Sequence, residues 1–275
     1  MGEKVIDNKL PIANKKLGQH YLVDKNIINC ISNDFANVAD AILEVGPGPG
    51  ILTQKLAQRN LPYHVIEMDQ RFLPHLKELL TDRQITMADA LQTDFSALIE
   101  KLGWQEKKHI LLISNLPYNI SVPLTLKFVQ TPAIQMMTLM YQKEVAERIY
   151  SDRKKNSMGS LMALTQTYFS VSPLCQVSPA CFLPSPKVDS TVLSFQRRPS
   201  PELSLAEFKN YERFLRLLFS MKRKQVGTIL KSQFPAEKLV VAFSQCEISR
   251  TFRAETFNLE QVHILYRSLI NTHNQ

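Results

Sequence analysis

The 275-residue sequence has no long hydrophobic run, because no stretch approaches the ~18 consecutive apolar residues that a transmembrane helix needs. Residues 1–16, MGEKVIDNKLPIANKK, contain neither the apolar core of a secretory signal nor the arginine-rich pattern of a mitochondrial transit peptide. A myristoylation motif is excluded too, since Ile6 stands where Ser or Thr is required. We therefore expect a cytoplasmic protein with no membrane partner.

Cysteine is also scarce, and its four positions form no C-x-x-C pair: Cys30, Cys175, Cys181 and Cys246. Such a distribution is typical of reduced, mostly buried thiols in a cytosolic protein. We expect no bound metal ion. The chain lacks internal repeats and low-complexity segments, and its 44% hydrophobic content suits one large domain or one large and one small domain.

What the sequence has in excess is positive charge, with a formal net charge of +8 and a pI of about 9.3. Nucleic acid is a reasonable partner, although many basic proteins bind none. From Ser200 onward, 11 Lys and Arg stand against 7 Asp and Glu, so the tail is more basic per residue than the rest. The runs Arg153–Lys155 and Met221–Lys224 either reach phosphates or form solvated surfaces.

Apolar runs alternate with helical segments over the first half of the chain. Lys25–Phe35 is expected to form a helix with Asp24 as its N-cap. The apolar runs are Ala41–Val45, Tyr63–Ile66, Gln84–Met87, Ile110–Ile113 and Met136–Tyr141. This rhythm predicts a parallel sheet covered by helices on both faces. Pro173–Val177 and Ser190–Phe195 follow a different pattern and suit a final antiparallel hairpin.

The pattern changes near Arg198-Pro199-Ser200-Pro201. Beyond it, large apolar residues recur at helical spacing: Phe208, Tyr211, Phe214, Leu215, Leu218 and Phe219. This spacing predicts a small helical domain in which the apolar stripe forms the core. We therefore predict two domains, an α/β domain over residues 1–199 and an all-α domain over residues 200–275.

The first predicted strand ends in a glycine-rich turn, ILEVGPGPG, which is typical of a nucleotide-containing cofactor at the carboxyl end of a sheet. The glycines Gly46, Gly48 and Gly50 do not match the dinucleotide pattern G-x-G-x-x-G, because Ile51 stands where the third glycine belongs. The prolines between them lack the N–H groups that would bind pyrophosphate, and no Gly-Lys-Ser/Thr follows. The loop suits S-adenosylmethionine, which has no phosphate, and a tight turn without a ligand is the alternative.

Acidic residues end the next two strands. Glu67 lies 21 residues after Gly46, close to the offset at which a carboxylate accepts from ribose hydroxyls. Asp89 is placed to accept from the adenine amine of the cofactor. Either acid alone would be read as a solvated loop residue, but these strand ends and Asn115 converge on one crevice in an open α/β sheet.

The stretch Asn115-Leu116-Pro117-Tyr118 can act on an adenine amine. The N6 nitrogen is a poor nucleophile. The Asn115 side-chain oxygen and the Leu116 carbonyl can accept hydrogen bonds from its two N–H groups. Pro117 would fix the chain so that both acceptors point at one atom. Tyr118 offers a face on which a flipped base stacks. An ordinary Asn-x-Pro turn with a packed tyrosine is the alternative.

With these motifs, the chain resembles the small-subunit ribosomal RNA adenine dimethyltransferases of the KsgA/RsmA type over nearly its whole length. The resemblance rests on KKLGQHYLVD (15–24), LEVGPGPGILT (43–53), VIEMD (65–69), ADAL (88–91), SNLPYNIS (114–121), QKEVAERI (142–149), FLPSPKVDS (182–190), FSMKRKQV (219–226) and RAETF (253–257). It implies a Rossmann-like α/β methyltransferase sheet, mostly parallel with an antiparallel last hairpin, and a small C-terminal all-α domain that docks RNA.

The resemblance also implies roles for particular residues. Cofactor contacts are expected from His20, Leu22, Gly46, Glu67, Asp89 and Asn115. Phe182 would be a second aromatic at the target base, beside the Asn115–Tyr118 motif. The family usually has Asn where His20 stands and Phe where Tyr21 stands, and often Arg where Ser160 stands. We predict RNA contacts at Lys222, Arg223 and Lys224.

The implied activity is transfer of methyl groups from S-adenosylmethionine to N6 of two adjacent adenosines in the 3′-terminal hairpin loop of 16S rRNA. The expected partner is the 30S subunit, the expected state is a monomer, and no metal takes part. Two alternatives remain at this point. One is a 23S rRNA adenine methyltransferase of the macrolide-resistance type, and the other is a non-catalytic ribosome-assembly factor on the same fold.

Overall fold

The computed structural model describes residues 11–14, 18–150, 157–221 and 223–270. These residues divide into two compact units. The first contains the described residues up to Ala146 together with Val171–Arg197. The second contains the described residues of Glu147–Ser170 together with those from Arg198 onward.

A seven-stranded sheet is the centre of the fold, with the strand order β4-β3-β2-β5-β6-β9-β7. The strands are β2 (Ala41–Val45), β3 (Tyr63–Glu67), β4 (Ile85–Met87), β5 (Ile110–Asn115), β6 (Ile134–Gln142), β7 (Phe169–Val177) and β9 (Ser190–Arg197). Neighbours from β4 to β6 are parallel, and β9 is antiparallel to β6. The predicted fold class, a mostly parallel sheet with antiparallel end strands followed by C-terminal helices, is confirmed.

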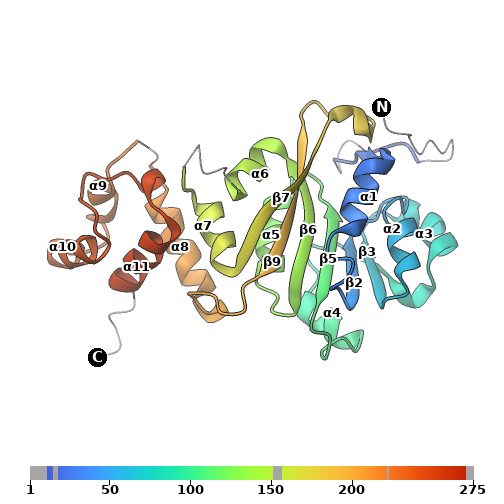
Figure 1. Cartoon of the computed structure of the whole chain (residues 1–275), viewed down its shortest axis with the longest axis horizontal. Coiled ribbons are helices and arrows are strands. Elements are labelled where there is room, and N and C mark those ends of the chain that lie inside the picture. The colour runs from blue at the N-terminus through green and yellow to red at the C-terminus, as the bar shows by residue number, and fades with distance from the viewer. Residues whose placement is uncertain (1–10, 15–17, 151–156, 222, 271–275) are drawn as a thin grey trace. The chain divides into compact units, whose positions relative to one another are not determined.

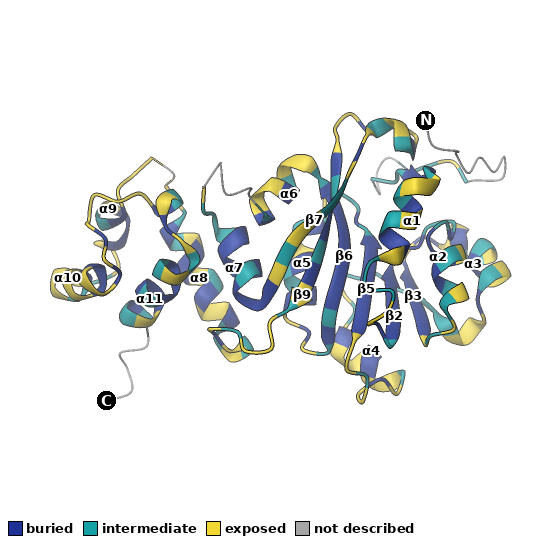
Figure 2. Cartoon of the chain, in the orientation of Figure 1, coloured by how far each residue is buried: buried dark blue, intermediate teal, exposed yellow. Residues whose placement is uncertain are grey.

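Four helices connect the parallel strands (Figure 1): α2 (Thr53–Leu56), α3 (Leu73–Leu79), α4 (Phe95–Lys101) and α5 (Ser121–Val129). Helix α1 (Lys25–Asn33) precedes β2, and α6 (Lys143–Ile149) follows β6. Every residue of β2 and β3 is buried, and so are the first five of β5. Figure 2 shows these strands as a continuous buried layer. Burial on both faces explains why they are near-continuous apolar runs rather than alternating ones.

The edge strand β7 begins four residues earlier than its predicted start at Pro173. A proline usually interrupts a strand, because it cannot donate to the ladder. Strand β7 is the last strand of the sheet, where one side of the backbone has no partner strand among the described residues. Pro173 can therefore lie inside it.

A two-residue strand ties the N-terminal segment to the link between β7 and β9. Strand β1 (Tyr21–Leu22) pairs antiparallel with β8 (Phe182–Leu183). The N–H of Val23 also donates to the Cys181 carbonyl at 2.8 Å. Helix α1 then begins as predicted, since the Asp24 carboxylate accepts from the next two free N–H groups.

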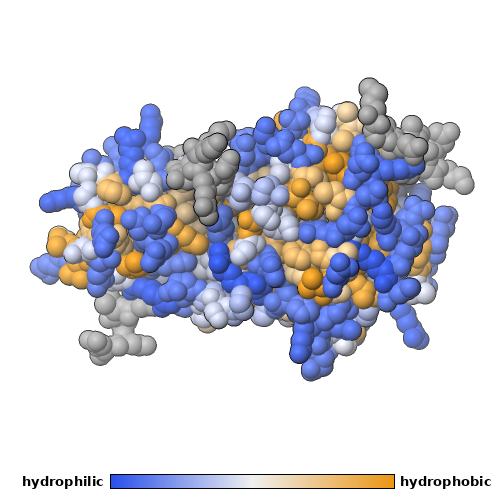
Figure 3. Space-filling view, viewed as in Figure 1, coloured by the Kyte–Doolittle hydropathy of each residue, from blue (hydrophilic) through white to orange (hydrophobic). Residues whose placement is uncertain are grey.

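The second unit consists of helices: α7 (Ser160–Tyr168), α8 (Phe208–Leu218), α9 (Val226–Leu230), α10 (Ala236–Gln245) and α11 (Leu259–Ile270). The predicted apolar stripe lies on α8, and five of its six members are buried, with Phe219 half-buried at the helix end. It is core, as expected. Helix α10 leaves Val240 and Val241 exposed, and Figure 3 shows hydrophobic side chains at the surface there.

The two units do not coincide with the division at residue 199 predicted from the sequence. Helix α7 belongs to the helical unit, where the Thr167 hydroxyl is 2.8 Å from Nε2 of His263 and 3.3 Å from the Tyr211 hydroxyl. Its apolar sequence resembles a helix that covers a parallel sheet, so the pattern alone did not assign it to the helical unit. No described helix is long and apolar enough to cross a membrane.

A buried carboxyl group lies on β2, one residue before the end of the strand. Glu44 is 1% exposed, and its Oε2 accepts hydrogen bonds from the hydroxyls of Thr53 and Tyr63. Burial raises the pKa of Glu44 to about 7, although these two hydrogen bonds oppose the shift. In the unfolded chain the pKa would be about 4.3, so the folded state binds the proton more tightly.

We expect Glu44→Gln to show how this proton changes the free energy of unfolding with pH. A raised pKa stabilises the folded chain fully below the unfolded pKa, and that contribution is lost as the pH rises through about 7. Gln cannot ionise and keeps an acceptor oxygen. The free energy of unfolding of the variant relative to the parent should therefore rise by about 1–3 kcal/mol between pH 5 and pH 8. Urea unfolding at both pH values measures this, and a pH-independent difference would contradict it.

Candidate active site

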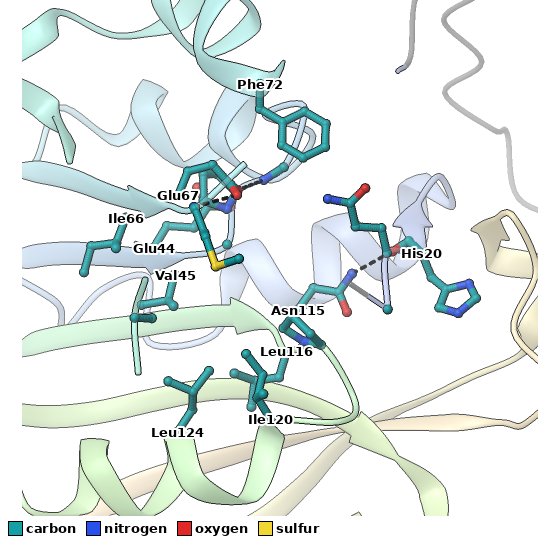
Figure 4. Close-up of a pocket in the computed structure, with 18 of the residues that line it drawn as sticks. His20, Glu44, Val45, Ile66, Glu67, Phe72, Asn115, Leu116, Ile120 and Leu124 are labelled. Atoms are coloured by element: carbon teal, nitrogen blue, oxygen red, sulfur yellow. Dashed lines mark hydrogen bonds between the residues drawn. The ribbon is translucent and has the colours of Figure 1, made fainter. Parts of the chain in front are cut away.

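One cavity of about 280 Å³ opens at the carboxyl ends of the parallel strands (Figure 4). All the predicted cofactor residues line it: His20, Leu22, Gly46, Glu67, Asp89 and Asn115. Leu116, Pro117 and Tyr118 line it too. In Figure 4 Glu67 and Asn115 approach the cavity from different sides, one from the end of β3 and the other from the end of β5. The structure thus brings together residues that lie 95 positions apart, and their roles stay predictions.

The glycine turn leaves room for a ligand. Gly46 and Gly48 have φ values of +69° and +57°, which other residues rarely adopt. A Cβ atom built on either would meet nothing within 4 Å, so it would point into open space beside the turn. The Gly46 N–H donates to the Ile66 carbonyl at 2.9 Å, and this hydrogen bond links the turn to β3. A cofactor without phosphate fits this turn, because the prolines offer no donors.

Glu67 is held by the backbone around it. Its Oε2 accepts from the Gly48 N–H at 2.9 Å, and its Oε1 accepts from the N–H groups of Met68 and Asp69, both at 2.8 Å. Burial raises the pKa of Glu67, and the three backbone hydrogen bonds oppose that shift. Carboxylate oxygens have further lone pairs, so both can still accept from ribose hydroxyls.

Two more acids follow strand ends, Asp69 after β3 and Asp89 after β4. Oδ1 of Asp89 accepts from the Leu91 N–H at 2.8 Å, and among the described residues its Oδ2 has no hydrogen bond. Asp69 binds Arg71, whose hydrogen bonds lower the pKa of that carboxyl to about 2. Gln19 also donates to Asp69 at 2.8 Å, and this joins the N-terminal segment to the cavity wall.

The side-chain amide of Asn115 is oriented by the N-terminal segment. Its Nδ2 donates to the backbone carbonyl of His20 at 3.1 Å, drawn as a dashed line in Figure 4. Since the amino group is engaged there, the Oδ1 atom is the end left to accept from a substrate amine. The preceding Ser114 is fixed as well, because its hydroxyl donates to the Val45 carbonyl at 2.6 Å. The strand end is therefore rigid where the amide must be aimed.

The Pro117–Ile120 turn follows, closed by the Ile120 N–H donating to the Pro117 carbonyl at 3.1 Å. The Tyr118 hydroxyl lies 2.8 Å from the Ser190 hydroxyl, and the ring stacks on His20 with centroids 5.8 Å apart. Burial raises the pKa of the Tyr118 phenol, so it stays protonated at neutral pH. The motif is neutral, so it adds no charge to the cavity.

The residues that line the cavity do not include three other predicted site residues, Phe182, Arg223 and Lys224. Phe182 does not line the cavity, because it is 3% exposed, packs in the core and pairs with Leu22. Its expected contact with the target base stays a prediction. Arg223 and Lys224 are exposed in the second unit, and Lys222 lies outside the described residues.

Sequence reasoning missed several residues that shape the site. Glu44 and Gln19 line the cavity, and Ser190 binds the motif tyrosine. A charged residue inside an apolar strand is a signal that could have singled out Glu44. Ser190 ends the FLPSPKVDS stretch, but nothing in the sequence pattern pairs it with Tyr118, 72 residues away. Within the described residues, no group of three or more His, Cys, Asp or Glu side chains could hold a metal ion.

Comparisons with known proteins agree with this geometry. The family model for ribosomal RNA adenine dimethylase matches residues 12–271. A Clostridium botulinum protein named ribosomal RNA small subunit methyltransferase A is 35% identical, over 95% of this chain and 96% of that protein. A Geobacter metallireducens protein of the same name is 34% identical, over 94% and 96%.

Two solved structures share the architecture. A dimethyladenosine transferase from Plasmodium falciparum has a TM-score of 0.73 at 25% identity, covering 90% of this chain and 96% of that one. The 23S rRNA methyltransferase ErmE has a TM-score of 0.68 at 24% identity, covering 90% and 99%. At this identity the second likeness concerns the fold alone.

Proposed function

Because the chain belongs to the ribosomal RNA adenine dimethylase family, we propose that it dimethylates two adjacent adenosines in the 3′-terminal hairpin loop of 16S rRNA. The full-length relatives at 34–35% identity, which bear a small-subunit name, support this substrate. The methyl donor is S-adenosylmethionine, and the partner is the 30S subunit in the cytoplasm. The chain acts as a monomer and needs no metal ion.

The observation that carries the proposal is the meeting of two sets of residues in one cavity. Glu67 and Asp89 offer carboxylate oxygens suited to a ribose and an adenine amine, while Asn115 offers an oriented amide oxygen. S-adenosylmethionine, when bound, supplies a methyl group made electrophilic by its sulfonium. Placing an amine acceptor next to a cofactor site suits transfer of that methyl group to nitrogen.

The side chains of the motif act on the incoming base. The Asn115 oxygen and the Leu116 carbonyl accept from the N6 amine and draw it toward a tetrahedral geometry, while Tyr118 holds the base in position. The amine proton becomes acidic once the nitrogen is alkylated, so no strong general base is required. This account agrees with the neutral residues around Asn115.

Methyl transfer to ribosomal particles tests the function directly. The protein is incubated with labelled S-adenosylmethionine and 30S particles from a strain that lacks the modification, and the rRNA is then digested to nucleosides. We expect labelled N6,N6-dimethyladenosine in 16S rRNA. Label in 23S rRNA alone would favour the other class of methyltransferase, and no label at all would favour a non-catalytic assembly factor.

Glu67→Ala should weaken cofactor binding. The variant loses up to two ribose hydrogen bonds to a charged acceptor, and each is worth about 1.5–3 kcal/mol at most. We expect calorimetry to show at least about a tenfold loss of affinity. Since Glu67 also accepts three backbone N–H groups, a thermal melt must show that the variant is folded. Glu106→Ala, which removes an exposed acid, is the control, and unchanged affinity in folded Glu67→Ala would refute the assignment.

Asn115→Ala should separate catalysis from cofactor binding. Its amide acts mainly on the incoming amine, so the cofactor affinity should change only a few-fold while single-turnover methylation falls by about 10²-fold. The comparison variant is Asn119→Ala, which lines the same cavity from the following turn. A near-normal turnover rate in Asn115→Ala would show that the acceptor role is wrong.

The basic run in the second unit should contact rRNA phosphates. Changing Lys222, Arg223 and Lys224 together to Ala should weaken binding to 30S particles, and each lost phosphate contact should remove roughly 0.7–0.9 from the salt slope. Cofactor affinity should not change. The control triple Lys101, Lys107 and Lys108 to Ala removes equal charge just before β5, at the end of the sheet opposite the cavity. Equal affinity and slope in the parent and the Lys222–Lys224 variant would place RNA docking elsewhere.

A further inference from the structure

The ring of Tyr118 is fixed by a residue that lies outside the motif. Its hydroxyl is 2.8 Å from the hydroxyl of Ser190, which is completely buried. The backbone of the tyrosine is fixed separately, because the Ser121 hydroxyl donates to the Tyr118 carbonyl at 3.0 Å. Backbone and ring therefore have different anchors, and the anchor of the ring comes from another strand.

Ser190 is held on a rigid element. It is the first residue of β9 and lies opposite Gln142 in the antiparallel ladder with β6. The Lys143 N–H donates to the carbonyl of the preceding Asp189 at 2.9 Å. The pairing with β6 and the hydrogen bond at Asp189 fix the backbone here, so the Ser190 side chain can hold a ring in place to within about 0.5 Å.

One face of the Tyr118 ring is already covered. The imidazole of His20 stacks on it with centroids 5.8 Å apart and an angle of 27°, and its Nδ1 is 2.8 Å from the Pro184 carbonyl. A base between two rings would need a separation of about 7 Å, twice the optimal distance of carbon atoms. In Figure 4 the His20 ring also points away from the Glu67 side of the cavity. An adenine must then use the other face of Tyr118, and His20 supports the ring from behind.

We propose that Ser190 is a positioning residue for methyl transfer, since its hydroxyl holds the Tyr118 ring as a fixed platform against which the target adenine stacks. The inference rests on the proposed function and names a specific support for it. Without the hydrogen bond the ring can turn about its Cα–Cβ bond, and a stacked base turns with it. The N6 nitrogen then meets the Asn115 oxygen less often. The affinity for the particle depends on contacts elsewhere and stays the same.

The test compares Ser190→Ala, Tyr118→Phe and the double variant in single-turnover methylation of unmodified 30S particles. Each single change should lower the saturating rate about three- to tenfold, the value of one hydrogen bond, because both remove the same contact. The double variant should be no slower than the slower single variant. Affinities for S-adenosylmethionine and for the particle should stay within about twofold of the parent.

Tyr141→Phe is the matched control. It removes another buried tyrosine hydroxyl, 2.7 Å from the Thr125 hydroxyl, and Tyr141 does not line the cavity. We expect both Tyr141→Phe and Tyr118→Phe to lower the melting temperature, but only Tyr118→Phe to lower the methylation rate. An active parent with an unaffected Ser190→Ala variant, or a double variant whose loss is the product of the single losses, would overturn the inference alone. A parent unable to methylate 30S particles would reject the proposed function and this inference with it.

Discussion

Parallel pairing of β2 with both β3 and β5 is the interaction on which the rest of the site depends. From β2 the chain continues on one side into β3 and β4, and it later returns on the other side into β5 and β6. The strand order thus reverses at β2, and a crevice opens at the carboxyl ends there. Residues suited to the cofactor end or follow the strands on one side of this crevice, and Asn115, which we propose acts on the amine, ends β5 on the other. Transfer between them needs no large movement of the sheet.

The N-terminal segment completes what the sheet begins. Pairing of Tyr21 and Leu22 with Leu183 and Phe182 brings the His20 carbonyl to the Asn115 amide and the His20 ring to Tyr118. Without these contacts, the amide could turn and present its amino group to the substrate. A neutral amide oxygen accepts a hydrogen bond only over a limited range of angles, so a site that acts through one depends on its orientation. The segment therefore contributes geometry to the chemistry.

Much of the sheet was predictable from the sequence, because buried parallel strands are apolar runs between helices, and Asp24 marked the start of α1. The convergence of strand ends also predicted Gly46, Glu67, Asp89 and Asn115 in one crevice, whereas His20 and Leu22 followed from the resemblance. The missed features depend on long-range contacts. A two-residue pairing such as β1–β8 has no periodicity, so the burial of Phe182 could not be foreseen. Helix α7 belongs to the helical unit although it precedes residue 199, and its sequence does not reveal this, because an apolar helix fits either core.

Two carboxyl groups on neighbouring strands, Glu44 and Glu67, line the same cavity but have different hydrogen-bond donors around them. Glu44 accepts from two hydroxyls and is 1% exposed, and burial raises its pKa to about 7. Glu67 is also buried, yet three backbone N–H groups surround its oxygens and favour the charged form. Repulsion from Glu67 adds to the rise of the Glu44 pKa, whereas the backbone donors around Glu67 oppose the rise of its own pKa. The surroundings of Glu67 therefore favour the charged form more than those of Glu44 do, at a carboxylate that also accepts from the N–H of Gly48 in the glycine turn.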